Sequence, residues 1–217
     1  MNLRSPHRAP AQKLRERLRE ATNEAILAAA EKVFAEQGLR AAKMEAIAGE
    51  AGVAVGTLYN HFEDRESLLA ELVAARRQQL VDRMDEALEK SERQPFAVQL
   101  RALVFGLCQH LEEHQAFLTI WMECDASRDG SSLRLALNKP NRDLRPMEEI
   151  YRRVETLVRR GLREKALRPE GAELYPAMLM GMLKGFMHRR LSLSHANVPL
   201  DVRVEQIAEF FLHGAGA

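Results

Sequence analysis

The sequence predicts an all-α fold of about nine helices. Apolar residues recur at spacings of three and four along almost the whole chain, as expected of helices that turn one face to a core. Ala, Leu, Glu and Arg, which favour helices, are abundant, whereas alternating stretches rich in Val, Ile and Thr are nearly absent. Glycines and prolines between the periodic stretches divide the chain into separate helices.

The first helix is expected to run from near residue 12 to Gly38, which suits a left-handed C-terminal cap. Its core-facing residues would be Ile26, Leu27, Ala30, Val33 and Phe34. Upstream, the same face continues without a breaker through Leu14, Leu18, Ala21 and Ala25.

Short helices are expected over 43–51 and 55–61, with Gly52 in the turn between them. Asp64 can cap a long fourth helix, because its carboxylate can accept a hydrogen bond from the first turn. The inward positions of that helix are Leu68, Leu69, Leu72, Val73, Leu80, Val81, Met84 and Leu88.

Five more helices are expected, over 96–113, 115–127, 146–165, 172–193 and 201–214. The glycine- and proline-containing stretch 128–145 would be the longest connection. The organisation predicted from these elements is a basic arm or helix extension (1–20), an N-terminal helical domain (21–66) and a larger C-terminal helical domain (67–217).

Composition narrows the functional class. The chain is 46 % hydrophobic and 29 % charged, which is typical of a soluble globular protein, and no apolar run approaches the roughly 18 residues that span a bilayer. The N-terminus has no apolar signal segment, so we expect a cytoplasmic protein with no membrane partner. The two cysteines, Cys108 and Cys124, indicate neither a disulfide framework nor a zinc site, and no cofactor or metal is expected.

Basic charge is concentrated at the N-terminus. The whole chain carries a formal charge of +1, but residues 1–20 hold six Lys and Arg against two Glu, a net +4. Residues 21–70 hold four basic against eight acidic side chains, a net −4. A basic arm beside an acidic unit is a candidate contact for nucleic acid.

Two short helices joined by a glycine turn, after a packing helix, form a helix-turn-helix pattern. The residues that make it specific are Phe34-Ala-Glu-Gln-Gly38, Ile47-Ala48, Ala51-Gly52-Val53, Gly56-Thr57-Leu58-Tyr59, His61-Phe62, Arg65-Glu66 and Leu68-Leu69. In order and spacing, this series resembles the signature of the tetracycline-repressor-like (TetR) family of regulators. The resemblance covers roughly residues 25 to 73. It implies that 21–66 is a TetR-type helix-turn-helix DNA-binding domain and that 67–217 is a regulatory and dimerisation domain.

The resemblance implies that Thr57, Tyr59, His61 and Arg65 contact DNA phosphates, for which hydroxyl, imidazole and guanidinium donors are suited. An alternative for Tyr59 is a core aromatic, whereas Leu58 and Phe62 are expected in the core. Base contacts are expected from Val55, Asn60 and Thr57, since Asn suits adenine edges and Val suits a thymine methyl. The remaining candidate DNA contacts are Arg4, Arg8, Lys43 and Ala54.

Two positions depart from the family pattern. Ala42 and Ala54 stand where the second and third helices usually have a hydroxyl N-cap. Each change removes a cap worth about 0.5 to 2 kcal/mol and a phosphate ligand. We expect the basic arm to compensate, although it could equally be a solvated extension with no role.

A homodimer interface is predicted on the last two helices. Ala177, Gly181 and Gly185 recur every four residues and would let helices approach closely. The flanking residues are Met178, Met182 and Phe186, and the matching face of the last helix is Val204, Ile207, Ala208 and Phe211. The alternative is a packing strip within one chain.

In the family, a ligand cavity lies among the helices between the fourth and the eighth. The candidate lining residues are Phe96, Leu100, Leu103, Leu107, Cys108, His110, Leu111, Phe117, Ile120, Trp121, Cys124, Tyr151 and Val154. At helical spacing each apolar member is more often core than ligand contact. His110 and His114 could bind a metal, but no third ligand is nearby, and a solvated pair is expected.

The leading hypothesis is a regulator, a repressor released from a roughly palindromic operator by a small, largely apolar inducer of unknown identity. A second is a DNA-binding regulator without such a ligand, controlled by a protein partner or by oxidation of Cys108 or Cys124. An enzyme is disfavoured, because the chain has no nucleophile elbow, phosphate-binding glycine loop or HExxH motif.

Overall fold

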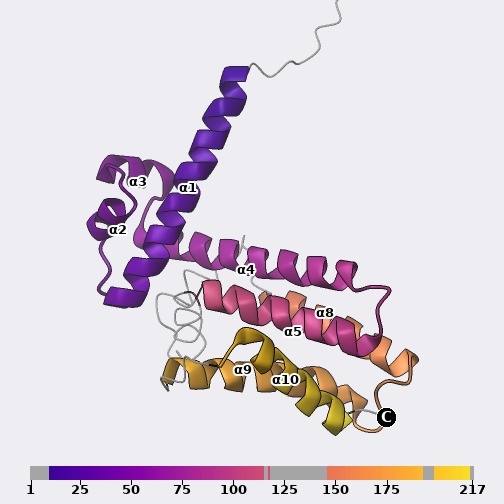
Figure 1. Cartoon of the computed structure of the whole chain (residues 1–217). Coiled ribbons are helices and arrows are strands. Elements are labelled where there is room, and N and C mark those ends of the chain that lie inside the picture. Colours follow the sequence, from indigo (N-terminus) through magenta and orange to yellow (C-terminus); the bar gives the residue numbers. More distant parts are fainter. Residues whose placement is uncertain (1–9, 115–116, 118–145, 193–197, 216–217) are drawn as a thin grey trace, which may run out of the picture. The chain divides into compact units, whose positions relative to one another are not determined.

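A computed structural model of the chain describes residues 10–114, 117, 146–192 and 198–215 (Figure 1). Within these residues every regular element is a helix, which confirms the predicted fold class. The predicted helix over 115–127 lies outside the described residues apart from its third position, Phe117. The described chain divides into two compact units, one up to Ala74 and one from Ala75 onward.

The first unit contains α1 (Pro10–Gln37), α2 (Met44–Glu50), α3 (Val55–His61) and the start of α4 (Arg65–Lys90). Gly38 ends α1 with a φ of +80°, and its N–H donates to the carbonyl of Phe34 at 2.9 Å. The core of this unit is formed by Ile26, Leu27, Ala30, Val33, Phe34, Ile47, Ala48, Leu58, Leu68, Leu69 and Leu72. Leu14 and Leu18 do not belong to it, because each is 59 % exposed.

The start of α4 is capped as expected. The Asp64 carboxylate accepts a hydrogen bond from the N–H of Ser67 at 2.6 Å, and the N–H of Asp64 donates to the Ser67 hydroxyl at 3.1 Å. These reciprocal bonds satisfy two backbone donors at the helix start. They hold the beginning of α4 in a defined geometry immediately after α3.

The second unit contains the rest of α4, α5 (Phe96–Glu113), α8 (Pro146–Arg163), a 3₁₀ turn η1 (Ala172–Leu174), α9 (Tyr175–Ser192) and α10 (Leu200–Ala215). The predicted eighth helix therefore begins with a 3₁₀ turn, and its α-helical part starts at Tyr175. Helix α5 packs against α10 and α8, and α9 packs against both of those helices. Among the described residues no helix has the length and apolar character needed to cross a membrane.

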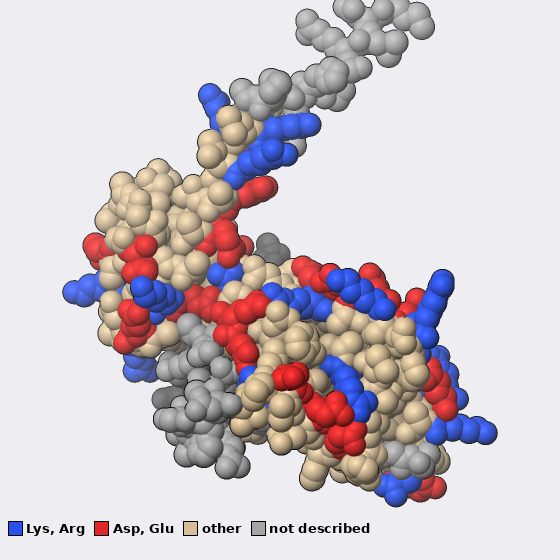
Figure 2. Space-filling view, in the orientation of Figure 1, with Lys and Arg blue, Asp and Glu red and all other residues tan. Residues whose placement is uncertain are grey.

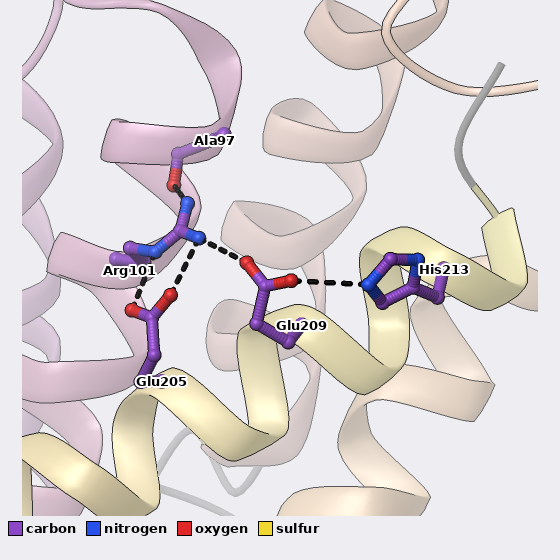
Figure 3. A network of polar contacts seen from close by, with 5 residues as sticks. All are labelled: Ala97, Arg101, Glu205, Glu209 and His213. Carbon is purple, nitrogen blue, oxygen red and sulfur yellow. Dashed lines mark hydrogen bonds and ion pairs between the residues drawn. The ribbon is translucent and has the colours of Figure 1, made fainter.

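Arg101 links α5 to α10 (Figure 3). Its guanidinium donates to both carboxylate oxygens of Glu205, at 2.7 and 2.8 Å, and also to Glu209. Glu209 in turn pairs with His213 at 3.2 Å. The fork geometry of the bidentate pair fixes the register of the two helices more firmly than a single ion pair could.

Gly161 marks the tightest approach in this unit. A Cβ at this position would lie 2.7 Å from the Phe96 ring and 2.8 Å from the Leu167 side chain. The residue is buried, so α8 and α5 can pack at this point only because it has no side chain.

Candidate functional site

Helix α3 is held in place by its buried face and by the turn before it. Gly52 has a φ of +68°, which favours glycine, and the N–H of Val53 donates to the carbonyl of Ala48 at 3.0 Å. Leu58 is fully buried and Phe62 is 6 % exposed, as the sequence predicted. These contacts anchor one side of α3 and leave the other side free.

The free side of α3 carries the predicted DNA contacts. Val55 is 37 % exposed, Tyr59 is 48 % exposed and Asn60 is exposed, whereas Thr57 and His61 are half-buried. Tyr59 is therefore not a core aromatic. A two-turn helix that offers a methyl-bearing, a phenolic and an amide side chain to solvent matches the chemistry of groove and phosphate contacts.

The helix caps agree with the sequence at one position and differ at the other. Ala54 is the N-cap of α3 and makes no side-chain cap hydrogen bond, as expected. The N-cap of α2 is Lys43, not Ala42. Ala42 is only 3 % exposed, so it packs into the core and the helix begins one residue later. The Lys43 side chain is exposed.

Arg65 has internal partners that the sequence did not indicate. Its guanidinium donates to the carbonyl of Arg40 at 2.7 Å and pairs with Glu66 at 2.7 Å. The arginine thus connects the loop after α1 to the start of α4. Two of its guanidinium nitrogens are therefore occupied within the chain, at a position that follows the C-terminal end of α3.

The first turns of α1 form a basic helical extension. Four cations on it are exposed and make no ion pair or hydrogen bond within the described part of the chain: Lys13, Arg15, Arg17 and Arg19. Figure 2 shows blue side chains gathered on this stretch. Arg4 and Arg8 lie outside the described residues. The described part of the basic arm is therefore helix continuous with α1.

Comparison with known proteins agrees with this geometry. Residues 26–72 match the family model of bacterial regulatory proteins of the tetR family. An uncharacterized HTH-type transcriptional regulator, YhgD of Bacillus subtilis, is 26 % identical over 176 residues, which are 81 % of this chain and 86 % of that protein. The chain belongs to the TetR family of DNA-binding transcriptional regulators.

Two further relatives match this TetR-family regulator. The HTH-type transcriptional repressor KstR2 of Mycobacterium tuberculosis is 31 % identical over 118 residues, about half of each chain (51 % and 54 %). A crystal structure of the transcriptional regulator FadR from Bacillus subtilis, in complex with stearoyl-CoA, superposes with a TM-score of 0.71 at 20 % identity. That superposition covers 88 % of this chain and 98 % of FadR and establishes the shared fold. The family is one of regulators and not of enzymes.

The predicted ligand-lining residues of this TetR-family chain are mostly buried in the second unit. Buried members are Phe96, Leu100, Leu103, Leu107, Cys108, His110, Leu111, Phe117 and Val154. Tyr151 is half-buried, and Ile120, Trp121 and Cys124 lie outside the described residues. A separate surface hollow, which the sequence did not predict, is lined by Leu162, Lys165, Leu167, Arg168, Pro169 and Ala172.

The expectation of a solvated histidine pair is wrong for His110. This side chain is fully buried on α5, and its ring centroid lies 4.6 Å from that of half-buried His114. Within the described residues no group of three or more His, Cys, Asp or Glu could hold a metal ion. The apolar spacing around position 110 was the signal that could have revealed its burial, because His110 shares a helix face with Leu103 and Leu107.

The predicted dimer residues fall into two groups. On α9, Ala177, Gly181 and Gly185 are exposed and Met178 is 52 % exposed, while a Cβ at either glycine would meet no described atom within 4 Å. No described helix of the same chain packs on this strip. Met182 is half-buried, and the Phe186 side chain is outside the described set.

On α10 the sequence assigned the wrong face. Val204, Ile207, Ala208 and Phe211 are each at most 6 % exposed, because they pack inside the chain; Phe211, for example, stacks edge-on against Tyr175. The exposed apolar residues of α10 are Val202, at 41 %, and Phe210, at 74 %.

Proposed function

We propose that this protein is a ligand-responsive repressor that binds a roughly palindromic operator as a homodimer. The observation that carries the proposal is the exposed face of α3, with Val55, Tyr59 and Asn60 above a buried Leu58. KstR2 is a transcriptional repressor and FadR was crystallised with stearoyl-CoA, and these two relatives support a repressor with a small-molecule response.

In the DNA complex, Val55 and Asn60 would contact base edges, and Thr57, Tyr59 and His61 would contact phosphates. Arg4, Arg8, Lys43, Ala54 and Arg65 complete the proposed interface. The unpaired cations of the α1 extension would add sequence-independent attraction to the phosphate backbone. This attraction would offset the hydroxyl caps that α2 and α3 lack.

The homodimer would form through the exposed strip of α9 and the exposed residues of α10. A row of small residues lets two helices approach closely, and Met178, Val202 and Phe210 supply apolar surface beside it. A two-fold axis through this surface would present two α3 helices to successive major grooves.

A bulky residue on the strip tests the dimer. Gly185→Leu should force the helices apart and give monomers in sedimentation velocity, whereas Gly56→Leu, also in open space but on α3, should leave the dimer intact. A Gly185→Leu protein that still sedimented as a dimer would remove α9 from the interface.

The ligand would occupy the second unit and lower DNA affinity. The division between the two compact units falls within α4, so this continuous helix belongs to both. A ligand that favours one tilt of α4 would change the position of the residues at its start. Coupling of about 1 to 3 kcal/mol would be ordinary, and by linkage DNA would weaken ligand binding by the same factor.

The alternative is a regulator controlled by oxidation or by a protein partner. Cys108 is only 4 % exposed, and a buried thiol reacts poorly with oxidants. Within the described residues, this observation favours the small-molecule hypothesis.

The experiment is a selection of double-stranded DNA from a random pool by the full chain, followed by titration of the enriched sequence. A palindromic site should emerge, and Asn60→Ala should weaken it while leaving unselected DNA unaffected. Failure to enrich any sequence would contradict the proposed function.

A further inference from the structure

Helices α4 and α5 bury four side-chain nitrogens that have no hydrogen-bond partner among the described residues. Nδ1 and Nε2 of His110 and Nη1 of Arg83 belong to this set, and a fourth such nitrogen is Nε of Arg77, also on α4. Buried polar atoms are satisfied in the great majority of cases, so these unpartnered nitrogens require an explanation. Those of His110 and Arg83 belong together, because the charge of Arg83 acts on the His110 ring. One explanation is a bound molecule that completes these hydrogen bonds.

His110 is uncharged at neutral pH. Burial, together with the charges of His114 and Arg83, lowers the pKa of its ring to about 4. The backbone of Arg76 acts in the opposite direction, although it makes no hydrogen bond of normal geometry to the ring. A neutral imidazole offers one N–H donor and one acceptor nitrogen.

Arg83 brings a further donor but little net charge. Its Nη2 pairs with the Glu113 carboxylate, which also accepts a hydrogen bond from Gln109 at 3.0 Å. The charge of the guanidinium is thereby neutralised, while Nη1 remains buried and unpaired. Arg76, a buried arginine on the same helix, already donates to Gln79 at 3.2 Å and has further partners.

The surroundings are apolar. The Phe117 ring meets His110 edge-on, with centroids 6.3 Å apart and planes at 77°. Leu107 and Leu111, on the turns of α5 beside His110, are buried. A molecule that reaches this point would therefore need an apolar body around any polar group.

We propose that Arg83 and His110 hold the uncharged oxygen group, a carbonyl or hydroxyl, of an otherwise apolar ligand. An oxygen with two lone pairs can accept from both donors, and a hydroxyl could also donate to the second imidazole nitrogen. A carboxylate fits less well, because Glu113 already balances Arg83 and a second anion would be buried without a countercharge. The inference rests on the proposed ligand response and names the chemical class of that ligand.

The test compares probes that share a skeleton and differ only in the polar group. The linear series is decan-2-one, decan-2-ol, decanoate and decane; the polycyclic series is androstan-3-one, androstan-3-ol and androstane. Affinities for the full chain would be measured by displacement of a fluorescent dye. In at least one series the ketone or alcohol should bind about tenfold more tightly than its hydrocarbon, as expected for one satisfied buried hydrogen bond. In the linear series the ketone or alcohol should also bind more tightly than decanoate.

Two variants assign the preference to these residues. His110→Phe removes both imidazole nitrogens, and Arg83→Met removes the unpaired donor on a side chain that is partly exposed, so folding is less at risk. Each should reduce the preference of the ketone over the hydrocarbon to about threefold or less. Arg159→Met, at an arginine that is 74 % exposed and pairs with Glu155 on its own helix, is the matched control and should change nothing.

The outcomes separate this inference from the proposed function. The inference would be overturned if decanoate bound more tightly than decan-2-one and decan-2-ol, or if both variants kept the preference of the ketone over the hydrocarbon. It would also be overturned if no probe bound, and ordered water would then be the occupant. A ligand that releases DNA equally from wild type and Arg83→Met would retain the proposed function and overturn this site. A probe bound through Arg83 and His110 without effect on DNA affinity would support the site and contradict the ligand response.

Discussion

The two compact units of this regulator carry their functional polar groups in opposite ways. In the first, Tyr59 and Asn60 project into solvent from a helix anchored by Leu58. In the second, His110 and one nitrogen of Arg83 are buried. Changes on α3 should therefore alter DNA binding with little effect on folding, whereas changes around α5 should alter stability as well as ligand binding.

Acidification should give the largest change in stability, and this change should come from the second unit, which contains His110. Between pH 6.5, the usual pKa of histidine, and about 4, the unfolded chain binds a proton at His110 that the folded chain does not. The free energy of unfolding therefore falls as the pH decreases through this window, by up to about 3 kcal/mol. Denaturant titrations at several pH values would measure the loss.

His110→Phe is the variant that isolates this effect. Its stability should change less between pH 6.5 and 4 than that of the wild type, while Glu113 and Glu205, whose pKa values are lowered by their arginine partners, contribute equally in both proteins. Identical pH profiles would mean that His110 is already protonated or accessible in the folded chain.

A methyl group at Gly161 should destabilise the second unit. Gly161→Ala places a Cβ 2.7 Å from the Phe96 ring, and overpacking of this kind costs about 1 to 3 kcal/mol. Gly56→Ala, on α3, meets no atom within 4 Å and should leave stability unchanged or raise it slightly. Equal thermal midpoints for the two variants would contradict the close packing of α8 against α5.

A substitution on the exposed face of α3 is expected to change DNA binding and not stability. Asn60→Ala should cost about 1 to 3 kcal/mol at the selected operator and little at unselected DNA, because a base contact is lost. Thermal unfolding should be within about 0.5 kcal/mol of the wild type, since the side chain is exposed. A large loss of stability would mean that Asn60 supports the fold instead.

The smallest effect per residue is expected from the basic extension of α1. Each phosphate neutralised contributes about 0.9 to the slope of log affinity against log salt concentration. Replacing Arg15 and Arg19 by Gln should lower that slope, whereas replacing Arg159 and Arg163, exposed on α8, should not. Anisotropy titrations at several salt concentrations distinguish the two pairs.

Local sequence signals predicted the elements well. The bounds of α3 and α5 match the expectation, and Gly38, Gly52 and Asp64 act at the turns and cap assigned to them. These features depend on short-range chemistry: backbone angles that favour glycine, a carboxylate one residue before a helix, and apolar spacing within one turn.

The sequence was less informative about which element packs against a given face of a helix. Apolar spacing identified a face of α10 at Val204 and Phe211, but it could not tell whether the chain itself or a second copy covers that face. The same limit applies to Leu14 and Leu18, which continue the pattern of α1 beyond the core. His110 lies on the same face of α5 as Leu103 and Leu107, and this apolar spacing was the available signal of its burial, although a polar side chain is more often exposed.

The burial of α5 also has a consequence for the kinetics of local opening. Ten of its eighteen residues are buried, and its ends are tied by Arg83 to α4 and by Arg101 to α10. Backbone amides in the middle of α5 can exchange with solvent deuterium only when most of the second unit opens, so they should be among the slowest in the protein. The amides of α2 and α3, in seven-residue helices, should exchange through smaller fluctuations. A ligand at His110 would then slow exchange first in α5, and spread of that protection along α4 would mark the route by which binding reaches the DNA-contacting unit.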